Sequence, residues 1–315
     1  MSARGRAWLP ALAVAVTMLL WASAFVGIRH LGESFSPGAL ALGRLLVGAG
    51  CLGAVSLGRG YVPPTRREWG SIVAIGVLWF GIYNLALNAG ERSVDAGTAS
   101  MILQTSPLLI AVLAAAFLRE RFTATLGLGL LVAFAGVALI GLTSPESDGS
   151  GRAAAGVALC LLCAAVYSVS VILQKPLMQR LPAIQVTWLA CTVGAVCCLP
   201  FAATLLDEAR VASPADLGWL AYLGVFPTAV AFTTYAYALG HMSASRLGVT
   251  TYLVPPITIG LAWLFLGEVP APVAYVGGGL ALLGVAIARR RSVRAGAEPP
   301  VDGVAALDDS SHPAR

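Results

Sequence analysis

The segment AGTASMILQTSPLLIAVLAAAFLRE, residues 96–120, is an apolar run interrupted by Pro107 and closed by Glu120. The segment ASRLGVTTYLVPPITIGLAWLFLGE, residues 244–268, has the same plan, with Pro255 and Glu268 at the equivalent places. The offset is the same for both pairs, since 255 − 107 = 268 − 120 = 148, and the match continues without a gap beyond the glutamates. An internal repeat of nearly half the chain is far longer than a solenoid unit, so it indicates a duplicated half.

Composition assigns the chain to a membrane. Hydrophobic residues make up 58% of the sequence and charged residues 11%, against roughly 25% charged residues in a soluble domain. So few charges cannot cover a polar surface. The sequence therefore predicts an all-α integral membrane protein, with the lipid bilayer as its surroundings and no nucleic-acid partner.

Ten apolar runs are close to the roughly 20 residues with which a helix crosses a bilayer. The first follows Arg4 and Arg6 like a secretory signal, but it is long enough to stay as a helix. We expect the ten transmembrane helices at about residues 8–28, 38–57, 70–89, 96–118, 124–142, 153–173, 184–206, 217–239, 247–266 and 270–288.

Lys and Arg divide unequally between the two sides of this topology. If the N-terminus is cytoplasmic, 14 of them lie inside and four lie outside, namely Arg29, Arg92, Arg152 and Arg210. Positive charge accumulates on the cytoplasmic side, so both termini are predicted to be cytoplasmic. Because each half has five helices, the second half must enter the membrane in the opposite sense. The fold class is therefore ten transmembrane helices as two inverted five-helix repeats.

Four segments follow from this division. The first five-helix repeat covers residues 1–143, a polar connecting loop covers 144–152, and the second five-helix repeat covers 153–291. The tail, 292–315, is rich in Ala, Pro, Gly and Asp without an apolar period, and we expect it to be disordered.

Arg44 is the clearest candidate for solute binding. It lies seven residues into the second predicted helix, and the repeat has Leu189 or Ala190 at its place. An ionisable residue inside a span is a functional hypothesis by default, and a guanidinium offers a fixed fork of donors to a carboxylate or phosphate. The alternative is that Arg44 reaches a headgroup or the carbonyls of a helix end.

Other polar and aromatic residues lie inside the spans. Such side chains could contact a solute, or they could bond between helices and fill the core. The candidates for substrate binding, besides Arg44, are Trp21, Tyr83, Asn84, Gln104, Tyr167, Tyr235 and Tyr252.

Pro107 and Pro255 are predicted to interrupt their helices near the middle of the membrane. Matching breaks in both halves point to a site between the repeats. No Asp or Glu lies deep in any span, the six cysteines fall within apolar runs, and no histidine cluster occurs. We therefore expect no catalytic residues, no metal and no cofactor.

These motifs resemble the EamA family of the drug/metabolite transporter superfamily. The resembling residues are 21–25 (WASAF), Pro37 followed by Arg44, residues 106–107 leading to 117–120 (FLRE), and residues 252–255 (YLVP) leading to 266–268 (LGE). The resemblance covers about residues 8–290 and occurs twice. It departs at Arg119, where glycine is usual.

The resemblance implies an inner-membrane exporter or exchanger of amino acids, other metabolites or drugs. We therefore expect a secondary transporter of small organic solutes that works by alternating access, and not an enzyme. A non-transporting sensor or scaffold, and a membrane-embedded enzyme, are the alternatives. Small-residue faces such as Gly277 with Ala281 favour packing within the bundle, and a homodimer is their second use.

Overall fold

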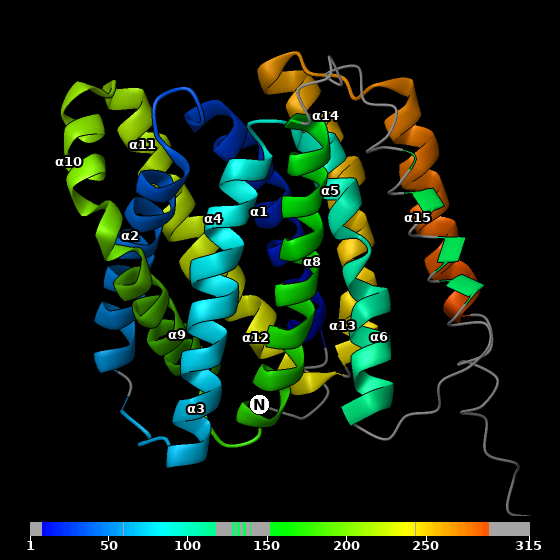
Figure 1. The fold of residues 1–315 in the computed structure, drawn as a ribbon. Coiled ribbons are helices and arrows are strands. Elements are labelled where there is room, and N and C mark those ends of the chain that lie inside the picture. Colours follow the sequence, from blue (N-terminus) through cyan, green and yellow to red (C-terminus); the bar gives the residue numbers. More distant parts are fainter. Residues whose placement is uncertain are drawn as a thin grey trace, which may run out of the picture.

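The computed structural model describes residues 8–58, 60–117, 128–129, 131–132, 135–136, 139, 152–242 and 244–289, and all regular elements among them are helices. Figure 1 shows these helices side by side in one bundle. Seven helical spans are long and apolar enough to cross a membrane, and residues 251–266 and 275–284 form shorter apolar helices. Most of the predicted fifth span, residues 144–151 of the connecting loop, Glu120 and the tail lie outside the described residues.

Several helices of the first half are composite. A π-helix, η2, joins α3 to α4, and the predicted helix at 96–118 is divided into α5 and α6. The bounds are α1 (Leu9–Leu31), α2 (Pro37–Leu57), α3 (Arg66–Ile75), η2 (Gly76–Ile82), α4 (Tyr83–Gly90), α5 (Ala96–Leu103) and α6 (Ser106–Phe117).

The second half has the same kinds of interruption. A second π-helix, η4, joins α11 to α12, and a 3₁₀ turn, η5, separates α13 from α14. The bounds are α8 (Arg152–Leu177), α9 (Ala183–Cys198), η3 (Leu199–Phe201), α10 (Ala202–Val211), α11 (Pro214–Leu223), η4 (Gly224–Val230), α12 (Ala231–His241), α13 (Ala244–Thr250), η5 (Thr251–Leu253), α14 (Val254–Leu266) and α15 (Pro272–Arg289).

Local sequence signals set the helix ends. Thr65 and Glu68 form a capping box at the start of α3, and the Asp95 carboxylate accepts the Thr98 N–H at the start of α5. Both devices satisfy backbone donors that the first turn leaves free. Gly267 ends α14 with φ of 67°, a left-handed conformation that glycine adopts without steric cost.

The helical irregularities recur at the offset of the sequence repeat. The π-helices begin at Gly76 and Gly224, and 224 − 76 = 148. The helices that lead into them are capped by Thr65 and Ser213, and 213 − 65 = 148. π-Helices are rare in proteins, so two of them at one offset extend the duplication from sequence to backbone geometry.

The two π-helices also pack in equivalent ways. A Cβ atom added to Gly76 would lie 2.5 Å from Cβ of Val193 on α9, and one added to Gly224 would lie 2.5 Å from Cβ of Val47 on α2. The valines are separated by 193 − 47 = 146 positions. Each half thus inserts a glycine of its π-helix against the second helix of the other half.

Candidate functional site

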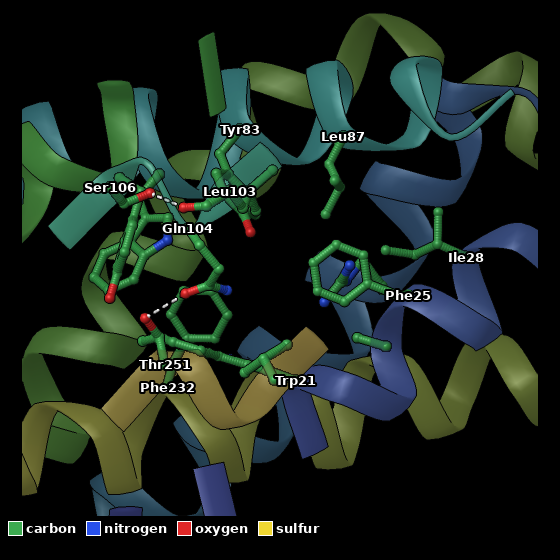
Figure 2. Close-up of a pocket in the computed structure, with 15 residues that line it drawn as sticks. Trp21, Phe25, Ile28, Tyr83, Leu87, Leu103, Gln104, Ser106, Phe232 and Thr251 are labelled. Atoms are coloured by element: carbon green, nitrogen blue, oxygen red, sulfur yellow. Dashed lines mark hydrogen bonds between the residues drawn. The ribbon is translucent and has the colours of Figure 1, made fainter. Parts of the chain in front are cut away.

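A small cavity of about 50 Å³ lies at the centre of the bundle, where α1, α2, η2, α4, α8 and α12 meet the two interrupted helices. Its polar lining comes from Arg44, Gln104, Ser106 and Thr251. Most of the remaining wall is aromatic or aliphatic, and Figure 2 shows both kinds of side chain around the space. The lining is completed by Trp21, Ala24, Phe25, Ile28, Trp79, Tyr83, Leu87, Leu103, Tyr167, Phe232 and Val254.

The helix breaks bring polar groups to this cavity. Pro107 cannot donate to the carbonyl of Leu103 four residues earlier, and the hydroxyl of Ser106 donates to that carbonyl instead, at 2.6 Å. Across the cavity, the hydroxyl of Thr251 in η5 donates to Oε1 of Gln104 at 3.0 Å (Figure 2). The two breaks therefore meet each other, and each keeps its polar groups satisfied.

Arg44 is buried beside the second π-helix. Its side chain is 3% exposed, and its Nε donates to Oγ1 of Thr228 in η4 at 3.2 Å. The Thr228 hydroxyl donates in turn to the carbonyl of Leu223, at 2.8 Å. Within the described residues no carboxylate lies at ion-pair distance from Arg44. The cavity therefore contains a guanidinium without a directly paired carboxylate among the described residues, and burying such a charge is costly.

An aromatic cluster forms the wall nearest Trp21. The ring of Trp21 lies 4.8 Å from Tyr235 and 5.5 Å from Phe232, and Trp79 lies 5.0 Å from both Tyr167 and Phe232, all measured between ring centroids. The phenol oxygens of Tyr167 and Tyr235 are 2.7 Å apart and share a hydrogen bond. The indole Nε1 of Trp21 is buried without a hydrogen-bond partner in the described structure. The wall thus offers flat apolar surface and one free donor.

The structure brings together five of the eight residues predicted from the sequence. Trp21, Arg44, Tyr83, Gln104 and Tyr167 line the cavity. Tyr235 lies behind the wall, in contact with Trp21 and Tyr167.

The other two candidates lie elsewhere. The amide of Asn84 donates to the carbonyls of Trp79 and Phe80 in η2, at 3.3 and 2.8 Å, and does not line the cavity. Tyr252 lies in η5 with its side chain outside the lining.

Some lining residues were not predicted. Trp79 and Phe232 are aromatic residues in apolar runs, and the sequence gives no sign of which side they face.

Glu91 follows the last residue of α4, and Arg29 is the third residue from the end of α1. From the sequence, Arg29 counted only as an outside charge and Glu91 was not singled out, yet Glu91 is 2% exposed and Arg29 forms an ion pair with Glu268.

The fold and the site define a multi-pass membrane protein with a central cavity between broken helices. The chain belongs to the EamA-like transporter family, whose model matches residues 8–142 and again residues 154–290. It is a membrane transporter of that family. The second match repeats the first across the two halves, in agreement with the internal repeat.

Several named proteins are similar to the chain. It is 34% identical to a protein of Streptantibioticus cattleyicolor named "Probable terminal-alkyne amino-acid exporter", over 89% of this chain and 93% of that one. It is 31% identical to the "Uncharacterized transporter YdfC" of Bacillus subtilis, over 84% and 86% of the two chains. A crystal structure with 22% identity superimposes with a TM-score of 0.65, over 91% of this chain and 98% of that one, and supports the fold alone.

Proposed function

We propose that the protein is a secondary transporter that exports small zwitterionic, amino-acid-like or amphipathic solutes through the central cavity by alternating access. The observation that carries this proposal is the buried Arg44 guanidinium, which lines the cavity with no carboxylate at ion-pair distance among the described residues. A bound carboxylate would balance this charge through paired hydrogen bonds.

The solute's apolar part would lie against the aromatic wall. Trp21, Trp79, Tyr167 and Phe232 offer ring faces, and the free indole N–H of Trp21 is a donor that a polar group of the solute would accept. The relative from Streptantibioticus cattleyicolor, named as an exporter of an amino acid with an alkyne group, supports this class of cargo.

The size of the cavity supports a cycle of closing and opening. Ligand pockets usually have about 300–1,000 Å³, whereas this cavity has about 50 Å³, room for a few water molecules. A solute would enter only after helices separate. In the proposed architecture, ten helices form two inverted repeats, and rocking one repeat against the other opens the site to either side.

The recurrence of η2 and η4 at one offset supports the inverted repeat, because equivalent helices then meet equivalent partners. We place the protein in the cell (inner) membrane with both termini cytoplasmic, from the distribution of Lys and Arg.

Efflux from proteoliposomes tests the proposal. Liposomes containing the purified protein would be preloaded with a mixed pool of amino acids and other metabolites, and the contents would be followed by mass spectrometry against protein-free liposomes. We expect selective loss of zwitterionic solutes, and no such loss with Arg44→Ala. If folded wild-type protein releases no solute, with or without a proton gradient, the sensor or scaffold alternative replaces the carrier.

A further inference from the structure

Glu91 is a buried acid at the end of α4. It directly follows Gly90, the last residue of α4, and its side chain is 2% exposed. Neither carboxylate oxygen has a hydrogen-bond partner among the described residues. Charge at such a place is strongly disfavoured, so burial favours the neutral, protonated carboxyl group.

An ion pair lies beside this residue. Nε of Arg29, on α1, donates to Oε1 of Glu268 just after α14, at 2.7 Å. Nη1 of the same guanidinium donates to the backbone carbonyl of Glu91, at 2.6 Å. Arg29 therefore joins the ends of α1, α4 and α14. Its guanidinium pairs with the carboxylate of Glu268 and also contacts the backbone of Glu91, so the carboxyl groups of Glu268 and Glu91 compete for it.

This cluster lies next to residues that line one end of the cavity. Arg29 directly follows Ile28, which lines the cavity, and the Glu91 N–H donates to the carbonyl of Leu87, another lining residue, at 2.9 Å. Figure 2 shows Ile28 and Leu87 at the same end of the space, away from Gln104 and Thr251. The Arg29–Glu268 pair therefore ties α1 to α14 at this end.

The second half provides an internal control for the role of Glu91. Lys175, at 175 − 29 = 146 positions from Arg29, donates to the carbonyl of Leu239 at 2.5 Å. Leu239 is at 239 − 91 = 148 positions from Glu91. The repeat thus reproduces the cation and the carbonyl but has leucine in place of glutamate. The carboxyl of Glu91 is therefore not needed for this helix-end contact.

Charged and titratable groups face Glu91 from every element around it. Arg29 and Arg44 favour its charged form, and burial together with the carboxyls of Glu268 and Asp95 favours its neutral form. Burial is the largest influence and raises the pKa of the Glu91 carboxyl above its usual range. The remaining neighbours are the phenol of Tyr83 and the thiols of Cys160 and Cys163.

We propose that Glu91 is a proton-binding site that controls the Arg29–Glu268 ion pair. While Glu91 carries a proton, Arg29 stays with Glu268 and this end of the cavity is closed. When the proton passes to water, the carboxylate draws Arg29 away from Glu268, and α1 separates from α14. The link to solute movement rests on the proposed transport function, but proton binding and the movement of the ion pair can be measured without a solute.

Infrared spectroscopy tests the protonation directly. Purified protein in lipid nanodiscs should show a carboxylic-acid C=O band that persists at neutral pH, where ordinary Asp and Glu are ionised. The band should disappear in Glu91→Gln and remain in Asp207→Asn, a matched control because the Asp207 carboxylate is 75% exposed in a surface ion pair with Arg210. A Glu91→Gln spectrum that keeps the whole band would overturn the proposal.

Thermal unfolding gives a readout that does not depend on the band. Glutamine resembles a protonated glutamate in shape and charge, so Glu91→Gln should melt within a few degrees of the wild type. If Glu91 is instead ionised and held by arginines, its removal leaves buried positive charge and lowers the melting temperature markedly. That result would also contradict the proposal.

A distance measurement tests the coupling to the gate. Spin labels at Glu33 and Val269, both exposed and just beyond the ends of α1 and α14, would be introduced into a Cys197→Ser background, which removes the exposed native thiol. Raising the pH from about 6 to about 9 should populate longer distances in the wild type. Glu91→Gln should keep the short distance throughout. A wild type without pH response, or a variant that responds equally, would refute the coupling and leave the carrier proposal intact.

Discussion

At the scale of single residues, the central interaction is that of Arg44 with its surroundings. The sequence identified this residue because an arginine inside an apolar run is rare and expensive. The structure adds the partner, Thr228, and shows no carboxylate at ion-pair distance among the described residues. Thr228 could not be identified from the sequence, because the sequence does not show that this segment is a π-helix or that the Thr228 hydroxyl contacts Arg44.

Arg44 gives the most direct residue-scale prediction. Replacing it with alanine should weaken binding of the solute by about 10- to 100-fold, since hydrogen bonds to charged groups contribute about 1.5–3 kcal/mol. Arg44→Lys should recover only part of this loss, because an ammonium cannot form the paired geometry. Titration calorimetry with the solute found in the efflux experiment measures both.

Arg210→Ala is the matched control for this series, since Arg210 is 75% exposed and distant from the cavity lining. It should bind as the wild type does. Unchanged affinity in Arg44→Ala would exclude a carboxylate-binding role for Arg44.

Residue-scale prediction from sequence had definite limits here. Trp21 and Tyr167 were identifiable because they occupy equivalent places in the two halves, 167 − 21 = 146 positions apart. From the sequence, Asn84 was indistinguishable from a solute-binding amide, but its side chain donates a hydrogen bond to the carbonyl of Phe80 in η2. Glu91 was not singled out because it lies at the edge of an apolar run, and only three-dimensional packing buries it.

At the scale of elements, Pro107 predicted the break between α5 and α6, and Pro255 predicted the break before α14, since proline removes a helical donor. The π-helices left no comparable signal. Their role is visible only in the packing, where Gly76 lies against α9 and Gly224 against α2. These contacts hold each half of the bundle to the other and support both Trp79 and Thr228.

The close approach of the π-helices can be tested with alanine substitutions. Gly76→Ala or Gly224→Ala would place a methyl group 2.5 Å from a valine Cβ, and overpacking of this kind costs about 1–3 kcal/mol. We expect a lower melting temperature for each in detergent or nanodiscs.

Gly70 and Gly218 provide the controls, because an added Cβ meets nothing within 4 Å at either position. Alanine there should leave stability unchanged or raise it by up to about 1 kcal/mol, through its higher helix propensity. Equal melting temperatures for the two pairs of variants would argue against tight packing at η2 and η4.

At the scale of the whole molecule, the protein combines two repeated halves, a pair of helix breaks and a small central cavity. The cavity is too small for an amino acid, and the Arg29–Glu268 pair lies next to residues at one end of it. Composition predicted the membrane class, and the internal repeat predicted the duplication. They could not predict how far the cavity is closed, because that depends on side chains from both halves.

The central claim is that one cavity serves both sides of the membrane in turn, and solute counterflow tests it most directly. Proteoliposomes loaded with a high concentration of unlabelled solute would be diluted into a trace of the same solute carrying a radioactive label. A carrier that alternates should accumulate label inside transiently, above the level outside, and Arg44→Ala should abolish this overshoot. Label that rises only to the outside level would indicate a channel, and absence of uptake by folded protein would contradict transport of that solute altogether.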